Sequence, residues 1–144
     1  MMSRRSILGL GLCVALAYAA YDWTRTHVEV VTLHASGAYS DYYTQLFIAD
    51  DPDDSHVVWI RAERPTRLWL KSVRANPEVT VRRGEREIRY HATVWSGEGD
   101  GDRARVDRIF RSKYGAIDRV AGWFFRRDAV PIRLDPSEKY ANGF

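Results

Sequence analysis

The sequence predicts a mainly β (α+β) domain, in which a small antiparallel barrel has short helices packed outside it and an N-terminal signal or anchor helix in front. Three observations support this fold class. Runs of β-branched and aromatic residues alternate with turn-forming residues, helical periodicity occurs in only a few short segments, and the chain begins with an uncharged apolar stretch behind two arginines. The expected order, β-β-β-α-β-β-α-α-β, consists mostly of hairpins and therefore favours a barrel.

The N-terminal segment 1–20 is predicted to be a twin-arginine-like signal peptide or a membrane anchor, with a linker at 21–26. Arg4-Arg5 precede the apolar stretch, and Ala17-Tyr18-Ala19 has the small-x-small pattern of a cleavage site. Residues 6–21 would form a helix of about 24 Å, against a hydrocarbon core of about 30 Å. Cleavage and membrane attachment both remain open. In either case we expect an exported, periplasmic domain or one anchored at the inner membrane and facing outward.

The composition of the remaining chain fits one domain with an adequate core. Removing residues 1–19 lowers the formal net charge from +3 to +1, so the charge gives no evidence for nucleic-acid binding. Five Trp, eight Tyr and five Phe supply large apolar side chains for a core. The single cysteine, Cys13, lies in the leader, so the domain is expected to have no disulfide and no cysteine metal site.

Six strands are predicted from the β-branched and aromatic runs. They are His27–Leu33, Tyr42–Ala49, His56–Ala62, Val79–Arg82, Glu87–Trp95 and Ala129–Leu134. The acidic cluster Asp50–Ser55 ends the second strand as an exposed turn. The fourth and fifth strands alternate strictly between apolar and polar residues, and Arg83-Gly84-Glu85 suits a tight hairpin between them.

Helices are predicted at two places within the domain, which we place at 27–136 before a polar tail at 137–144. A short helix follows the break at Arg64-Pro65-Thr66 and ends before Asn76-Pro77. After the Gly-rich loop 97–101, apolar residues at helical spacing predict an insertion of about two dozen residues, with one helical face on each side of Gly115.

Basic residues surround the short helix. They are Arg61, Arg64, Arg67, Lys71 and Arg74, and Glu63 is the only acid from Arg61 to Asn76. A helix N-terminus has unpaired N–H groups and a partial positive charge, so Arg67 in the first turn is unfavourable unless an anion lies nearby. A phosphate or carboxylate ligand would resolve this conflict, with roughly 1.5–3 kcal/mol from each charge-assisted hydrogen bond. The alternative is neutralisation by an acid of the 50–54 cluster or by water.

The stretch Arg61–Val81, RAERPTRLWLKSVRANPEVTV, resembles the deazaflavin-dependent nitroreductase family. In that family a strand ends in a basic or small loop, a Trp-bearing helix follows, and Ala-Asn-Pro-x-Val leads into the next strand. The helical insertion and a closing strand such as Val130–Leu134 match in order, so the resemblance extends from about Val28 to Asp135. It implies the split antiparallel β-barrel, a flavin-binding fold shared more distantly with pyridoxamine phosphate oxidases.

By this resemblance the domain would bind the deazaflavin coenzyme or FMN, with the phosphate-bearing tail on the loop 61–67. The implied cofactor-binding residues are Trp59, Ile60, Arg61 and Ala62, whose backbone groups would line the isoalloxazine or deazaflavin ring, together with Arg64, Thr66, Arg67, Trp69 and Lys71. The candidates for a substrate wall are Tyr42, Tyr43, Trp123 and Phe124, each of which would also suit a plain core position. A flavin carries its own redox chemistry, so no catalytic side chain is named. The expected substrate is a small electron-poor molecule such as a quinone or nitro compound.

One turn departs from the family pattern. Many members have a Gly-Arg-Lys-Thr/Ser-Gly type of turn between the first two strands, whereas this chain has Ser36–Asp41, which lacks the basic pair and adds an acid. This departure weakens the case for the long polyanionic coenzyme. It leaves FMN, haem, or a cofactor-free binding module of the cell envelope as alternatives. A twin-arginine leader favours a cofactor that is inserted before export, and the resemblance also suggests a homodimer.

Other function classes have little support in the sequence. His27 and His34 are an odd number of residues apart, so a strand would point them to opposite faces, and no other histidine pair has metal-ligand spacing. His91 lies on the polar side of its strand, where haem ligation is an alternative to simple exposure. Serine-nucleophile motifs and a basic aromatic strand platform for nucleic acid do not occur. The basic face at 103–113 suits solvent, or anionic lipid if the leader is retained.

Overall fold

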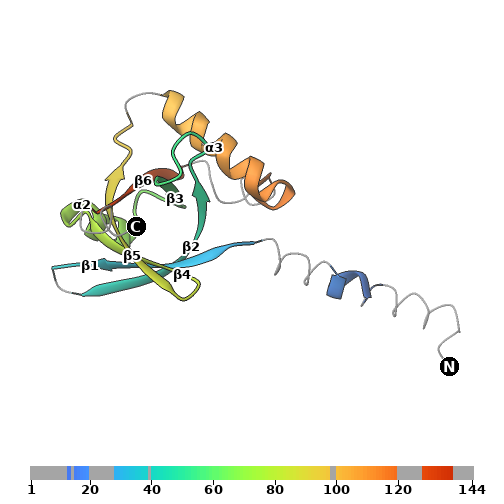
Figure 1. Cartoon of the computed structure of the whole chain (residues 1–144), viewed down its shortest axis with the longest axis horizontal. Coiled ribbons are helices and arrows are strands. Elements are labelled where there is room, and N and C mark those ends of the chain that lie inside the picture. Colours follow the sequence, from blue (N-terminus) through green and yellow to red (C-terminus); the bar gives the residue numbers. More distant parts are fainter. Residues whose placement is uncertain are drawn as a thin grey trace, which may run out of the picture.

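The computed structural model describes residues 13, 15–19, 28–38, 40–97, 100–119 and 128–137. Six antiparallel strands close into one barrel in the order β1-β2-β3-β6-β5-β4, and β4 pairs back to β1 (Figure 1). The strands are β1 (Val30–Ser36), β2 (Asp41–Asp50), β3 (Val58–Ala62), β4 (Glu78–Arg83), β5 (Arg86–Val94) and β6 (Val130–Pro136). The helices α2 (Leu68–Ala75) and α3 (Asp100–Tyr114) accompany them. The predicted mainly β antiparallel barrel with a few short helices is confirmed.

Strand alternation fills the barrel with apolar side chains. In β1 every second residue is buried, and these residues face buried positions of β4, with Leu33 opposite Val81 and Ala35 opposite Val79. Leu70 of α2 joins the same cluster, so this helix contributes to the barrel core as well as to its surface. Each such Leu or Val side chain contributes roughly 1.5–3 kcal/mol through its removal from water.

A second apolar cluster lies outside the barrel, where α3 packs against β2 and β3. It contains Ala49, Val57, Trp59, Val106, Phe110 and Tyr114. Because the barrel core covers one face of β3 and α3 covers the other, all residues of this strand are buried. Gly115 ends α3 with a positive φ of 53°, and the chain is helical again at 116–119. This agrees with the predicted change of helical face at Gly115, whereas residues 120–127 lie outside the described part.

Most strand boundaries differ from the prediction by one to three residues, and the pairing and the turns explain two of these differences. β1 was expected at 27–33 but occupies 30–36, because it pairs with β4 as far as Ala35 and with β2 as far as Ser36. β3 begins at Val58 rather than His56, whose N–H group donates a hydrogen bond to Asp54 Oδ1 (3.0 Å) within the acidic turn. The hairpin between β4 and β5 forms as predicted, with Gly84 at a φ of 61°.

Most of the predicted leader lies outside the described residues, including Arg4-Arg5 and the linker 21–26. Residues 15–19 are helical. None of the helices in the described ranges is long and apolar enough to cross a membrane. Export, cleavage and membrane attachment therefore stay predictions from the sequence.

Candidate functional site

Several of the predicted site residues meet around one hollow of about 610 Å³ at the start of α2. It is lined by Tyr42, Glu63, Arg64, Thr66, Arg67, Leu68 and Trp69. Tyr42 comes from β2, and the others come from the β3–α2 loop and the first turn of the helix. We call this region the basic hollow.

The start of α2 has free hydrogen-bond donors. Arg67 is the N-cap residue, has an extended backbone (φ −60°, ψ 133°) and makes no side-chain cap, and the first turn contains no acid. The Arg67 carbonyl accepts hydrogen bonds from the N–H groups of Leu70 (3.2 Å) and Lys71 (3.3 Å). The N–H groups of Leu68 and Trp69 have no protein acceptor within the described residues. An anion at this point would accept hydrogen bonds from both donors and interact favourably with the positive end of the helix dipole.

The charges of the basic hollow are only partly balanced. Arg67 pairs with Glu63, and both side chains are about half exposed. Arg64 is exposed and has no ion pair within the described part of the chain. The described lining thus contains two guanidinium groups and one carboxylate, which leaves a net positive charge beside the free N–H groups.

The acidic turn after β2 does not neutralise this charge, because its carboxylates are engaged elsewhere. Asp51 is buried and accepts hydrogen bonds from Trp59 Nε1 (2.7 Å) and from Arg105 (2.7 and 2.8 Å). The Arg105 guanidinium holds the pKa of Asp51 well below its usual range. Asp50 pairs with Arg83 on the hairpin. Of the acids considered from the sequence, only Glu63 reaches the basic hollow.

An apolar surface borders the charged part of the basic hollow. Leu68 is 60% exposed at the first helical position, beside the half-buried Tyr42 ring and the buried Trp69. An exposed leucine at this point is available to cover a planar apolar ligand. The sequence prediction did not include Leu68, although an apolar residue in the first turn of a basic helix was a usable signal.

Alternation along β3 separates the four predicted residues of that strand into two groups. Ile60 and Ala62 point into the barrel core. Trp59 lies in the outer cluster beneath α3. Because of this two-residue period, the structure does not bring all four side chains to the basic hollow.

Arg61 lies on the α3 side of the barrel, away from Arg64 and Arg67. Its buried guanidinium pairs with Asp107 (3.0 Å) and with Asp118, and it lies 3.9 Å from the centroid of the Phe110 ring. The resemblance predicts that Arg61 helps to hold the phosphate tail. In the structure it lies instead against Asp107 and Asp118 and does not line the basic hollow. Its charge is compensated by acids that lie far away in the sequence.

The remaining predicted residues also separate. Tyr43 is on the opposite face of β2 from Tyr42, and its ring stacks on His34 with a centroid distance of 4.5 Å. Lys71 is exposed on α2 but does not line the basic hollow. Trp123 and Phe124 lie outside the described residues.

The β1–β2 turn lies against α2 and Tyr42. A Cβ atom on Gly37 would be 2.5 Å from the Ser40 carbonyl oxygen, 2.9 Å from Ser72 Oγ and 3.3 Å from the Tyr42 ring. Only a glycine fits this contact without displacing its neighbours. The turn brings no cation to this place, and Asp41 at its end lies 3.6 Å from His34 Nε2.

No metal site is evident in the described ranges, where no three His, Cys, Asp or Glu side chains come together. None of the histidines that the structure describes lines the basic hollow. His91 is exposed on the outside of the barrel, and its Nδ1 lies 2.8 Å from Glu78 Oε1.

Comparisons with known proteins support the fold. A FAD-binding protein from Mesorhizobium loti is 15% identical with a TM-score of 0.54, over 76% of this chain and 82% of that chain. The haem storage protein HutZ from Vibrio cholerae is 11% identical with a TM-score of 0.58, over 83% and 89%. The F420-H2-dependent reductase FDR-A is 17% identical with a TM-score of 0.52, over 74% and 94%.

No family model matches the sequence, and the search of curated proteins finds no match. At these identities the similar structures establish the fold but not the activity. The closed six-stranded antiparallel barrel with its few short helices is therefore the split β-barrel, a fold found in flavin-, F420- and haem-related proteins.

Proposed function

We propose that this protein is an oxidoreductase that binds a flavin-type cofactor in the basic hollow and passes hydride or electrons to a small electron-poor substrate, such as a quinone or nitro compound. The observation that carries this proposal is the acid-free, uncapped start of α2 with Arg64, Thr66 and Arg67 around it. Guanidinium groups and free helix N–H groups together bind phosphate strongly. The similarity in fold to a FAD-binding protein and an F420-H2-dependent reductase supports the same class.

The residues of the basic hollow fit a cofactor that has a phosphate at one end and a planar ring at the other. Arg64, Arg67 and the Thr66 hydroxyl would hold the phosphate, together with the N–H groups of Leu68 and Trp69. The exposed Leu68 and the Tyr42 ring would cover the flavin. The bound flavin supplies the redox chemistry, while these side chains bind it, orient it and exclude water.

Among flavin-type cofactors, the geometry favours FMN over the deazaflavin coenzyme. The cations are confined to one short loop, and the neighbouring β1–β2 turn contributes Asp41 rather than a basic pair. A single phosphate matches this small positive region. A longer polyanionic tail would extend toward a turn that offers no compensating charge.

Haem is the second candidate, and the similarity to HutZ is the observation that favours it. Haem iron is usually held by a His, Cys, Met or Tyr side chain. The described lining of the basic hollow has no histidine, cysteine or methionine, and Tyr42 is its only residue of these types. The lining thus fits a phosphate better than it fits a haem iron.

The proposal can be tested by titrating the full-length protein with FMN, and separately with the deazaflavin coenzyme, while flavin fluorescence is followed. Charge reversal in Arg64→Glu or Arg67→Glu should weaken FMN binding about tenfold or more, equivalent to about 1.4 kcal/mol. Glu63→Gln should act in the opposite direction and tighten binding several-fold, because it removes the carboxylate that competes for Arg67.

Arg74→Glu is the matched control. Arg74 lies in the last turn of the same helix, is exposed, and is absent from the lining of the basic hollow. Its reversal should leave the FMN affinity within about twofold. Unchanged affinity in Arg64→Glu would remove the proposed phosphate site. Failure of both cofactors to bind below about 100 μM, an affinity of about 5.5 kcal/mol, would favour haem or a cofactor-free module instead.

A further inference from the structure

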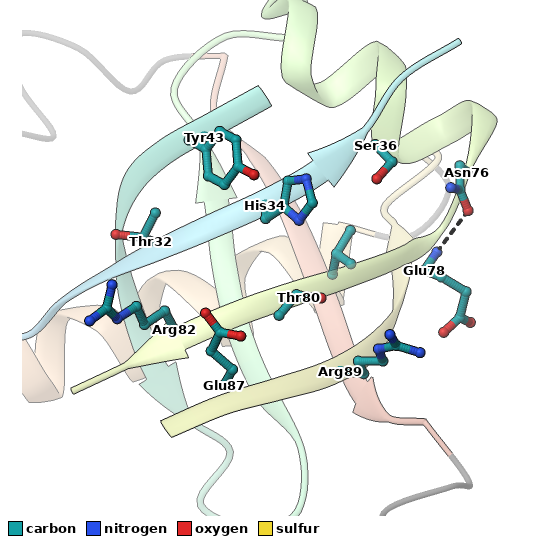
Figure 2. Close-up of a pocket in the computed structure, with 11 residues that line it drawn as sticks. Thr32, His34, Ser36, Tyr43, Asn76, Glu78, Thr80, Arg82, Glu87 and Arg89 are labelled. Atoms are coloured by element: carbon teal, nitrogen blue, oxygen red, sulfur yellow. Dashed lines mark hydrogen bonds between the residues drawn. The ribbon is translucent and has the colours of Figure 1, made fainter. Parts of the chain in front are cut away.

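A second hollow of about 700 Å³ lies on the outer face of the barrel, over β1, β4 and β5 (Figure 2). Tyr43 of β2 lies at one end of it, and Arg89 of β5 also lines it. We call it the sheet hollow. Among the described residues it shares no lining residue with the basic hollow, and Tyr42 and Tyr43 point to opposite faces of β2. An inference about the sheet hollow therefore stands apart from the proposed cofactor site.

The strand register explains why this face is hollow. His34 pairs with Tyr43 on one side and with Thr80 on the other, and Thr80 pairs with Arg89. These residues form one row across four strands, which spans about 14 Å at a strand spacing of about 4.8 Å. In Figure 2 the short Thr80 side chain lies near the centre of the face, between His34 and Arg89, and Thr32 lies to the left beside Arg82, while the longer side chains of Tyr43 and Arg89 lie at the two ends of the row.

The first end of the sheet hollow is aromatic. The rings of Tyr43 and His34 are nearly parallel, at an interplanar angle of 4°, and Tyr43 is nevertheless 70% exposed. His34 Nε2 is buried and has no hydrogen-bond partner among the residues that the structure describes, with Asp41 Oδ2 3.6 Å away. The stacking orients a large ring that remains open to solvent, and such a ring is a preorganised contact surface.

The other end is polar but carries no net charge. Arg82 and Arg89 line it together with Glu78 and Glu87, so its charges cancel. Arg82 and Glu87 are opposite each other in the register of β4 and β5. Within the described residues, however, their side chains form no ion pair. Carboxylates among the arginines disfavour a polyphosphate such as nucleic acid or an anionic lipid surface. Apart from the Tyr43 and His34 rings, Val79 is the one hydrophobic side chain among the described lining residues, so the polar groups of the lining favour a polar ligand.

We infer that the sheet hollow is a binding site for a short oligosaccharide that is neutral or carries amino groups. The apolar face of a sugar ring packs on an exposed aromatic ring, here Tyr43. Sugar hydroxyls both donate and accept hydrogen bonds, and they find guanidinium donors, carboxylate acceptors and the hydroxyls of Thr32 and Thr80. The span of about 14 Å favours more than one sugar ring.

The test is a calorimetric titration of the full-length protein with chitotriose, cellotriose and maltotriose. At least one of these should bind saturably with a Kd near about 1 mM. Tyr43→Ala should weaken that binding about tenfold or more, and Thr80→Arg should abolish it by filling the centre of the sheet hollow. Tyr42→Ala is the matched control, because it alters the opposite face of the same strand and should leave sugar affinity within about twofold.

FMN binding reports separately on whether the variants are folded. Tyr43→Ala and Thr80→Arg should keep the FMN affinity and the circular dichroism spectrum of the wild type, so a loss of sugar binding is then local. Failure of all three sugars to bind saturably below about 10 mM overturns the inference. Sugar binding that survives Thr80→Arg overturns it too. Light scattering that shows a dimer dissociated by Tyr43→Ala, without sugar binding, would assign this face to contact between two copies of the chain.

Discussion

Asp51 is a buried carboxylate with its charge compensated on both oxygens. Oδ2 accepts hydrogen bonds from Trp59 Nε1 (2.7 Å) and Arg105 (2.7 Å). Oδ1 accepts from Arg105 (2.8 Å) and from the N–H group of Asp53 (2.9 Å). At the residue scale this one side chain ties the β2–β3 turn to β3 and to α3. The Arg105 guanidinium holds its pKa well below the usual range, so it is ionised near neutral pH.

Asp51→Asn should therefore lower the free energy of unfolding by about 2–3 kcal/mol at pH 7, since it removes the buried one of the two carboxylates that pair with Arg105, the other being the exposed Asp53. The folded pKa lies below the unfolded value of about 3.9, so the stabilising contribution is complete above that pH and is lost as the pH falls through the folded pKa. Urea unfolding at pH 7 and at lower pH should show the difference between wild type and variant shrinking in acid. Asp53→Asn, with its side chain 81% exposed, is the control and should change stability by less than about 0.5 kcal/mol. A difference that does not vary with pH would contradict the assignment.

At the scale of the element, β3 shows what local sequence could and could not reveal. The β-branched and aromatic run predicted a strand, and the basic break after it predicted the loop that became the basic hollow. The pattern did not reveal which face of β3 would meet α3. The acids that pair with Arg61 are 46 and 57 residues away in the sequence, at Asp107 and Asp118. Local periodicity does not report such distant partners, so Arg61 was grouped with the neighbouring arginines.

The sheet hollow was missed for a similar reason. Tyr43 was predicted as a substrate-wall residue together with Tyr42, although strand alternation separates the two. The predicted first strand stopped at Leu33, so His34 was not expected on the outer face. The row of side chains from Tyr43 to Arg89 forms because β1 pairs with β2 on one side and with β4 on the other. This pairing depends on segments far apart in the sequence.

The structural role of Arg61 leads to a prediction about how α3 is held. Arg61→Met should destabilise the fold by about 3–5 kcal/mol, because it removes the buried guanidinium that pairs with the buried carboxylate of Asp118 and with Asp107. The folded fraction should keep the wild-type FMN affinity, since Arg61 does not line the basic hollow. Arg64→Met should show the reverse: a stability change below about 0.5 kcal/mol and clearly weaker FMN binding. Urea unfolding and FMN titration of both variants check this prediction. Weaker FMN binding by folded Arg61→Met would show that Arg61 contributes to cofactor binding after all.

At the scale of the whole molecule, one group of contacts joins distant elements to each other. Arg83 of the β4–β5 hairpin and Lys113 of α3 both pair with Glu29, which directly precedes β1. The Tyr114 hydroxyl donates to the Ile48 carbonyl of β2 (2.6 Å) and lies 3.0 Å from the Glu29 carbonyl. The order of elements was predictable from sequence, but this meeting of four segments depends on barrel closure. It should make the barrel and α3 unfold together.

Tyr114→Phe tests that coupling. Loss of the hydroxyl should lower the free energy of unfolding by about 1 kcal/mol at pH 7, because Lys113 still donates to the Ile48 carbonyl. Burial raises the pKa of Tyr114 to about 12. A folded pKa above the unfolded value of about 10 means that the stabilising contribution is complete below pH 10 and is lost as the pH rises toward 12. The stability advantage of the wild type over the variant should therefore shrink through this range. Burial also raises the pKa of Tyr90, but its effect cancels because both proteins retain this residue.

Tryptophan fluorescence and far-ultraviolet circular dichroism should give coincident urea transitions in the wild type, and separate transitions would show that α3 leaves the barrel first.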